Sequence, residues 1–584
     1  MKSDSLRFPR KATVALLLCT SVVASYPSTM WAEDSAKSAV QAVQQSITVK
    51  GVVSDAMGPV IGASVMEKEN KGNGTITDMD GNFSLNVKPG AVLIVSYIGY
   101  KTIEVQAIAN KPLHITLKED SEMLDEVVVV GFGTQKKVNL TGSVGIATAK
   151  ELESRPVSSA TQALQGLVPG LKITTNTGAL DQNMGISVRG TGTVGGFSKG
   201  DPLILIDGME GDLNSINPQD IESISVLKDA AASSIYGSRA PFGVILVTTK
   251  GGKEGKFSVN YSGNVRISSP INMPESMDSY TFALMMNEGL RQSGSNVRFS
   301  DATLQNMLDY QAGKLTDGLR PDEDNPSAWQ DMFTYGYANV DLLDELYKDN
   351  VMSQEHNMNI SGGSKKMNYY VSFNYLQQNG LLEIGDDGLK RYNVAAKINA
   401  DITPWLKFYY GTRLTRTDNW RPTDFDGDVY RDLTRNWPNV PLKDPNGYWF
   451  HPNVLKFADG GQRDKQTDFI YEQVAFTFEP IKNWITKAEF NYRMMNQNIK
   501  QSTIPAYAHN ALGDENNNKE TSYLYKDDTK DAYWNFNVFS EYSKTIADSH
   551  NFKVMAGFQA EHWGQEFFSS NVAGLLDPNF PDFN

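Results

Sequence analysis

The feature that most constrains the fold is an alternation of apolar and polar side chains in the carboxy-terminal half of the chain. Phe257–Ile267 is the first segment of this kind, and eight more follow it. A period of two residues is typical of a β-strand with one apolar and one wet face. We therefore expect strands at Phe257–Ile267, Glu355–Ser361, Met367–Leu376, Arg391–Ile402, Leu406–Arg416, Phe469–Phe478, Trp484–Met494, Ala532–Tyr542 and Phe552–Ala560.

The connections between these segments alternate between short and long. The short ones are Gly362–Lys366, Thr403–Trp405, Glu479–Asn483 and Ser543–Asn551, and the long ones are Ser268–Gln354, Gln377–Lys390, Thr417–Asp468 and Asn496–Asp531. Short turns on one side and long loops on the other are typical of an outer-membrane β-barrel, whereas a secreted β-sandwich has no reason to sort its loops. Residues 253–584 are thus predicted to form the first part of a transmembrane antiparallel barrel.

The number of predicted strands, about nine, is odd, and the last one runs towards the side of the long loops. An open sheet in a bilayer leaves the hydrogen-bonding groups of its edges unsatisfied. Barrels of about eight strands are filled by their own side chains and have no room for an inner domain. We therefore expect this chain to be the amino-terminal portion of a truncated or interrupted reading frame, and we predict that the 584-residue product does not transport by itself.

The amino terminus has the pattern of a secretory signal peptide. Basic residues in the first eleven positions precede the apolar run Ala12–Ala24, and Ala32 ends a polar stretch suited to cleavage. Residues 1–32 are assigned to the signal and 33–46 to a linker. The only cysteine, Cys19, lies in the apolar run, so the mature chain is expected to lack thiol catalysis, cysteine metal sites and disulfides. The net charge of −14 argues against nucleic-acid binding.

Residues 47–118 read as a small β-sandwich, with short strands separated by Gly, Pro and Asp turns. The expected strands are Ile47–Val53, Ala63–Met66, Gly74–Thr77, Asn82–Val87, Val92–Tyr97 and Leu113–Leu117. Thr77–Asn82 begins like a calcium loop, but Pro89 stands where the closing glutamate belongs, so a turn is expected. The segments GVVSD, GPVIGASV and GTITDMDGNFSLNV resemble the carboxypeptidase-regulatory-like domain, a transthyretin-type sandwich, which implies no catalysis by this domain.

A valine-rich run, Leu124–Gly133, follows the sandwich and strongly favours an extended strand. It has two open interpretations, a core strand or a free strand that a partner protein adds to its own sheet. A dinucleotide-binding fingerprint is excluded, because Lys136 occupies the position of the third glycine.

Residues 137–252 read as a compact α/β unit. Strands are expected at Leu203–Ile206, Ile221–Leu227 and Val244–Thr249, with a turn at Asp207-Gly208 and a short helix Ala230–Tyr236 that ends at Gly237. The segments RPVSSATQALQGLVPGLKI, ISVRGTGTV and DPLILIDGMEGDLNSINPQDIESISVLKDAAASSIYGSRAPFGVILVTTKGG resemble the plug of TonB-dependent outer-membrane receptors. Within that group the chain resembles the SusC/RagA family.

This resemblance implies an importer in the outer membrane with a barrel of twenty-two strands and no cofactor. Its ligand would be an oligosaccharide or a peptide, delivered by a SusD-like lipoprotein, and the TonB–ExbB–ExbD complex would pull a TonB-box-like segment at 119–136. The implied coupling residues are Asp125, Glu126, Val127, Val128, Val129, Val130 and Gly131. The implied plug-motif residues are Arg189, Gly190, Asp207, Gly208, Asn214, Pro218, Lys228, Asp229, Tyr236, Gly237 and Arg239.

No group of residues points to catalysis. The six histidines are scattered, and neither a nucleophile elbow nor a phosphate-binding loop is present, so neither an enzyme nor a metal site is expected. Two other classes stay open as alternatives, a binding or signalling receptor without transport and a secreted hydrolase with a regulatory-like module. We also predict a polar network that holds the plug in place and includes Asp207, Lys228, Asp229 and Arg239.

Overall fold

The computed structural model describes residues 46–55, 58–68, 70–97, 100–108, 112–117, 127–130, 133–136, 144–155, 157–175, 178–190, 200–229, 234–271, 273–425, 429–516, 521–546, 550–575 and 577. The predicted signal peptide lies outside these residues, as do the linker up to residue 45 and Asp125, Glu126 and Gly131. The chain divides into two compact units, Met1–Leu124 and Asp125–Asn584.

The first unit is a β-sandwich of two sheets. One sheet has the order β4-β1-β7, and the other has the order β3-β2-β5-β6. Alternate side chains, among them Val49, Val65 and Leu93, point into a shared core. The strands are β1 (Ile47–Ser54), β2 (Ser64–Glu67), β3 (Asn70–Ile76), β4 (Asn82–Val87), β5 (Val92–Ser96), β6 (Ile103–Gln106) and β7 (Leu113–Thr116). The six predicted strands are confirmed, and β6 is an addition, too short to show a clear period.

The Asp-Gly segment between β3 and β4 is a turn, as predicted. The Asp78 carboxylate accepts hydrogen bonds from the backbone amides of Asp80 (3.0 Å) and Asn82 (2.8 Å). An aspartate that bonds the backbone just beyond itself in this way replaces a backbone turn.

The valine-rich run opens the second unit, and it is not a single strand. β8 (Val127–Val130) pairs antiparallel with β9 (Gly133–Lys136) as a two-stranded sheet. One edge of β8 is therefore paired within the chain, which neither of the two interpretations of the valine-rich run included.

A mixed five-stranded sheet forms the centre of the plug, in the order β10-β15-β16-β13-β14, and a separate pair is β11-β12. The three predicted strands are confirmed as β13 (Leu203–Ile206), β15 (Ile221–Leu227) and β16 (Val244–Thr249). The remaining elements are β10 (Val144–Thr148), α1 (Ala149–Glu153), α2 (Ala160–Leu164), β11 (Leu171–Thr174), β12 (Gly185–Val188), β14 (Met209–Glu210), η3 (Leu213–Ser215), η4 (Pro218–Asp220) and η5 (Ser234–Arg239).

The predicted helix Ala230–Tyr236 needs a correction. Its first four residues lie outside the described part, and Ser234–Arg239 form 3₁₀ turns instead of an α-helix. Gly237 has the expected left-handed backbone, with φ 58°. The glycine separates the described residues of this run into two short turns.

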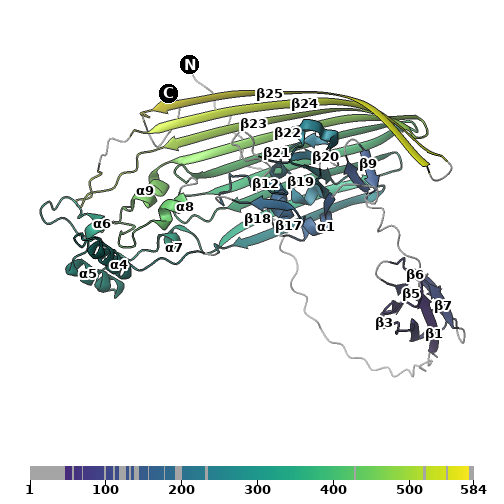
Figure 1. Ribbon diagram of the computed structural model, residues 1–584, viewed down its shortest axis with the longest axis horizontal. Coiled ribbons are helices and arrows are strands. Elements are labelled where there is room, and N and C mark those ends of the chain that lie inside the picture. The colour runs from purple at the N-terminus through teal and green to yellow at the C-terminus, as the bar shows by residue number, and fades with distance from the viewer. Residues whose placement is uncertain are drawn as a thin grey trace, which may run out of the picture. The chain divides into compact units, whose positions relative to one another are not determined.

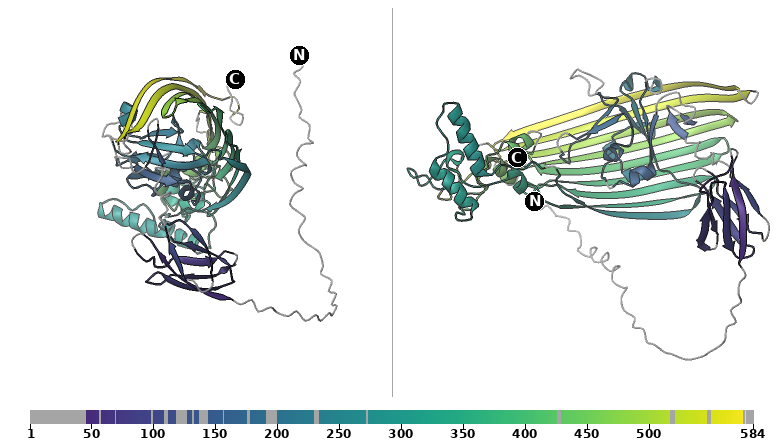
Figure 2. Two further views of the ribbon diagram at one scale, coloured as in Figure 1. Left: turned by 90° about the vertical axis from the view of Figure 1, so that its right-hand side faces the viewer. Right: turned by 60° about the horizontal axis from the view of Figure 1, so that its bottom comes forward.

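All nine predicted barrel strands are present, and each pairs antiparallel with its neighbour in chain order. Figures 1 and 2 show them as one curved sheet around the plug elements. They are β17 (Gly255–Ser268), β18 (Val351–Gly363), β19 (Met367–Asn379), β20 (Gly388–Thr403), β21 (Leu406–Pro422), β22 (Gln462–Ile481), β23 (Trp484–Thr503), β24 (Tyr523–Ile546) and β25 (His550–Ala573). No helix in the described part is long and apolar enough to cross a membrane.

The strands extend further towards the long connections than predicted. β25, for example, ends at Ala573 instead of Ala560, because its outer part is less apolar but still pairs residue by residue with β24. The connections also contain helices: α4 (Ser279–Gln292), α5 (Asp301–Gln311), α6 (Met332–Tyr335) and α7 (Leu342–Leu346) follow β17, and α8 (Val429–Thr434) and α9 (Pro452–Asp459) follow β21.

The two faces of the barrel sheet differ in polarity, as β23 shows. Phe490, Tyr492 and Met494 alternate with Glu489, Asn491 and Arg493. Glu489 and Asn491 are buried on the face that meets the plug, whereas Phe490 is exposed on the other face. On this strand the plug therefore faces polar side chains, and the outer face is apolar, as in a membrane barrel.

Candidate functional site

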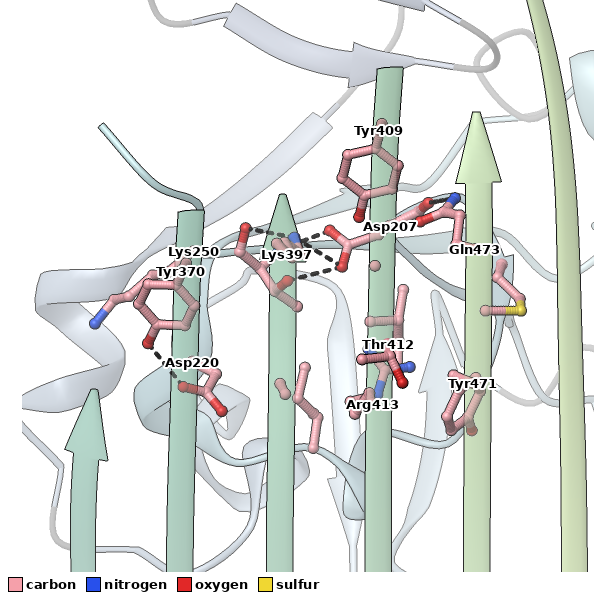
Figure 3. A pocket seen from close by; sticks show the side chains of 16 residues that line it. Asp207, Asp220, Lys250, Tyr370, Lys397, Tyr409, Thr412, Arg413, Tyr471 and Gln473 are labelled. Atoms are coloured by element: carbon pink, nitrogen blue, oxygen red, sulfur yellow. Dashed lines mark hydrogen bonds and ion pairs between the residues drawn. The ribbon is translucent and has the colours of Figure 1, made fainter. Parts of the chain in front are cut away.

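The plug contacts the inner face of the sheet through three groups of polar residues, and Asp207 is the centre of the first (Figure 3). It follows β13 with φ 51°, in the predicted turn with Gly208. Its carboxylate accepts hydrogen bonds from the Thr249 amide (2.9 Å) and hydroxyl (2.7 Å) and pairs with the Lys397 ammonium at 3.0 Å. Gln473 of β22 donates to the Asp207 carbonyl at 3.0 Å.

The charge state of Asp207 follows from two opposing effects. Burial by itself raises the pKa of a carboxyl group, but the Lys397 ammonium and the Thr249 amide lower the pKa of Asp207 by more, so its pKa lies below the ordinary value. Asp207 is therefore a carboxylate anion that is held between the plug and β20.

Asp220 is the second contact of this group, and its environment is different. Its carboxyl group accepts hydrogen bonds from the Tyr370 hydroxyl and the Ser372 hydroxyl of β19, both at 2.8 Å. Burial raises the pKa of Asp220, and these two neutral donors do not reverse the effect. Both aspartates line a small cavity, whose wall also includes Tyr409, Arg413 and Tyr471 (Figure 3).

In the second group of contacts, side chains of the barrel strands donate hydrogen bonds to backbone carbonyls of the plug. The Ser215 carbonyl accepts hydrogen bonds from the Asn393 amide group and the Thr415 hydroxyl, both at 2.8 Å. Arg391 donates to the Ser158 carbonyl at 2.8 Å. A buried Asn217–Asn357 hydrogen bond of 2.8 Å adds a side-chain contact with β18. These contacts are polar and orient the plug without interlocking apolar side chains.

The third group lies at the loop between β11 and β12. Asp181 in this loop pairs with Arg421 of β21 at 3.1 Å and with Arg463 of β22 at 2.6 Å. The Asp181 side chain is only 4% exposed. Beside it, a cavity of about 430 Å³ separates the plug loop from the barrel wall.

The four residues of the predicted plug network separate into two pairs. Asp207 and Arg239 reach the wall, since Arg239 bridges Glu210 of the plug and Glu561 of β25, the latter at 2.7 Å. Lys228 donates to the Pro169 carbonyl at 2.9 Å, inside the plug. Asp229 pairs with Arg189, also inside the plug. The contacts that Lys228 and Asp229 make with described residues therefore lie inside the plug.

The other motif residues shape the plug. Arg189 and Gly190 follow β12. Asn214 accepts hydrogen bonds from Ser159 (2.8 Å) and Thr161 (3.1 Å), and Pro218 opens η4. Tyr236 packs against the cluster that contains Leu227 and Leu246.

The sequence did not single out several residues of the plug–wall interface, namely Asp181, Asp220, Arg391 and Lys397. Arg391 and Lys397 are six residues apart in a predicted strand, so the period of two places both side chains on the polar, inward face. Their partners could not be predicted, because no local pattern distinguishes a polar residue that faces water in the lumen from one that binds the plug.

Two protein families match parts of the chain. The CarboxypepD_reg-like domain family matches residues 49–129, and the TonB-dependent Receptor Plug Domain family matches residues 136–244. The two matched segments cover the sandwich and most of the plug.

Curated relatives match over a longer span. TonB-dependent receptor P39 of Formosa agariphila is 32% identical over 540 residues, which cover 90% of this chain and 47% of the relative. TonB-dependent receptor SusC of Bacteroides thetaiotaomicron is 34% identical over 435 residues, 71% of this chain and 39% of the relative. The chain thus spans about half of the length of these relatives or less. Both are receptors and not enzymes, so the hydrolase alternative gains no support.

Among solved structures, the RagAB peptide importer in its open-open state has the same fold. The two chains superpose with a TM-score of 0.62 at 22% identity, over 78% of this chain and 51% of the other.

Proposed function

From the premise that this chain is a homologue of the SusC-type TonB-dependent receptors, a family of outer-membrane proteins, we propose that it works in nutrient import across the outer membrane. The imported ligand is an oligosaccharide or a peptide, which a SusD-like lipoprotein delivers. The plug and the regulatory-like domain face the periplasm. From that side the TonB–ExbB–ExbD complex supplies the energy for import. The outer, apolar face of β17–β25 contacts lipid.

The observation that carries this proposal is the polar character of the plug–wall interface. Hydrogen bonds and ion pairs join the plug to β18–β22 at Asp181, Asp207, Ser215, Asn217 and Asp220. Water can replace polar contacts when they separate, whereas separated apolar surfaces lose their burial free energy. A plug held in this way can shift and reopen a path without unfolding its own apolar core.

The coupling step is assigned to Asp125–Gly131. Within the described residues β8 pairs only with β9, so the second edge of β8 is open to a third strand. Addition of a strand from a partner to such an edge supplies affinity through backbone hydrogen bonds. TonB is the partner that we propose for this edge.

Val130 and Gly133 are the last pair of β8 and β9 before the connection, so the backbone of Val128 faces Gln135 of β9 and that of Val129 faces the open edge. Substitution of Val129 by proline tests the proposal, because proline cannot donate a backbone hydrogen bond. In a full-length receptor, Val129→Pro should abolish ligand uptake in the native host and weaken binding of the purified protein to the periplasmic domain of TonB by about tenfold or more, a loss of about 1.4 kcal/mol. Val129→Thr, which keeps the donor and the β-preference, is the matched control. Normal uptake with Val129→Pro at an unchanged surface level would refute the coupling role.

A further inference from the structure

The cavity beside Asp181 has a mostly polar lining. The plug contributes the loop Gly178–Met184, together with Ser158, Gln162 and Asp212, and the wall contributes residues of β19–β23. Amide and hydroxyl side chains predominate, and Phe469 is the one aromatic residue in the lining among the described residues. A volume of about 430 Å³ is within the usual range for small-ligand sites.

Positive charge exceeds negative charge around this cavity. Arg391 and Lys465 line it, and Arg421 and Arg463 approach it through Asp181. Among these six groups the two acids, Asp181 and Asp212, leave two positive charges in excess.

Asp181 and Asp212 are already engaged by the protein. One carboxylate oxygen of Asp181, Oδ2, forms ion pairs with both Arg421 and Arg463. One oxygen of Asp212 accepts hydrogen bonds from the Asn214 amide (2.8 Å) and side chain (3.0 Å). The side chain of Lys465, by contrast, has no ion pair or hydrogen bond within the part of the chain that the structure describes.

Some hydrogen-bond donors at the cavity also have no partner among the described residues. Arg391 is 4% exposed, and its Nε is buried without a partner among the described residues. The ammonium of Lys465, which also lines the cavity, adds further donors. The matching unfilled acceptor is a single atom, Oδ1 of Asp181. Buried polar groups are rarely left unpaired, since each costs about 1–3 kcal/mol. A ligand that completes this site must therefore offer more acceptors than donors.

We propose that this cavity selects an anionic ligand, an oligomer whose carboxylate groups bind between Lys465 and Arg391. The inference rests on the proposed import function and names the substrate class for it. A neutral sugar would leave the cations unpaired, and the lining offers only Phe469 for stacking on a sugar ring. Acidic oligosaccharides and acidic peptides carry the same carboxylate, so the experiment separates these two sources.

The full-length protein, purified in detergent, is titrated with two pairs of ligands. Hexaglutamate is compared with hexaglutamine, and oligogalacturonate is compared with its methyl ester. We expect the acid to bind about tenfold or more tightly than its neutral counterpart in one of the two pairs, since charge-assisted hydrogen bonds are the stronger ones. The pair that shows the difference identifies the source of the carboxylate. Equal binding within both pairs overturns the proposal.

Three variants assign the preference to the cavity. Lys465→Gln should remove it, and Lys465→Arg should retain it. Gln497→Glu, an isosteric change in the lining, should weaken binding of the acid without altering the neutral ligand. The control is Lys530→Gln, at an exposed lysine of β24 outside this cavity.

A preference that survives both Lys465→Gln and Gln497→Glu overturns the proposal. If the protein binds TonB normally but shows no preference for acids, only the substrate class is wrong, and the import function stands.

Discussion

The ammonium of Lys397, in β20 of the barrel wall, lies 3.0 Å from the carboxylate of Asp207, in the plug. Both side chains are about 15% exposed, so the pair is largely removed from water. Lys397 also donates to the Thr249 carbonyl at 3.0 Å, and the Asp207 carboxylate bonds the Thr249 amide. One wall residue therefore holds both the turn after β13 and the end of β16.

Lys397→Met should loosen the plug. The change leaves a buried carboxylate without its cation, and breaking a buried pair from one side costs about 3–5 kcal/mol. We expect faster trypsin cleavage within the plug of the purified protein. Lys407→Met, at an exposed lysine of β21, is the control and should leave cleavage unchanged. Equal cleavage rates for the two variants would contradict the role of Lys397.

Asp207 should stabilise the plug at neutral pH and lose this effect in acid. Its folded-state pKa is lowered, so its contribution is present above the unfolded pKa, about 3.9, and is lost as the pH falls through the folded value. Asp207→Asn should therefore lower the urea midpoint of plug protection at pH 7 and have a shrinking effect below about pH 4. A constant difference between pH 7 and pH 3 would show that the ion pair is not the cause.

Asp220 should have the opposite pH dependence. Its folded-state pKa is raised by burial, so the ionised form destabilises the fold above the folded pKa; the penalty shrinks as the pH falls through that value and is absent below the unfolded pKa. Asp220→Asn keeps an oxygen for Tyr370 and carries no charge. It should raise the urea midpoint at pH 7 and converge with the unaltered protein at lower pH. A lower midpoint at pH 7 would mean that the hydrogen bonds from Tyr370 and Ser372 stabilise the ionised form of Asp220.

Arg239→Ala should raise the passive permeability of the outer membrane to small antibiotics, because Arg239 joins Glu210 of the plug to Glu561 of β25. The readout is the antibiotic sensitivity of cells with equal surface levels of the protein. Lys228→Ala is the matched control, since Lys228 bonds only the plug carbonyl of Pro169 among the described residues. Similar sensitivity in the two variants would show that the ion pair between Arg239 and Glu561 does not hold the plug in place.

Gly252→Ala should impair assembly, whereas Gly251→Ala should not. A Cβ atom at Gly252 would lie 2.5 Å from the backbone nitrogen and oxygen of Tyr369 in β19, but at Gly251 it would meet nothing within 4 Å. Backbone atoms inside a paired strand cannot move aside, so the clash must displace the chain as it leaves the plug. The folded yield in the outer membrane, measured by heat modifiability on gels, distinguishes the two variants. Equal yields would show that the chain adjusts at this point.

The regular elements could be predicted from the sequence, because the patterns that mark them are local. Period-two alternation marked every strand from β17 to β25, and turn residues such as Asp78 and Gly237 marked the breaks, since both depend on neighbouring residues only. The prediction was less accurate at the outer strand ends, where β25 continues as a strand past its apolar part.

Which polar residues contact one another depends on the three-dimensional arrangement and could not be predicted. Asp220 and Tyr370 are 150 positions apart, and Asp181 and Arg463 are 282 positions apart. A charged residue at an inward position of a strand has the same pattern whether it faces water or binds the plug. The choice depends on the curvature of the sheet and on the position of the plug against it, and neither is encoded in any short segment. Lys228 and Arg239 illustrate this: both were predicted to hold the plug in place, and only Arg239 reaches the wall, because η5 lies next to β25.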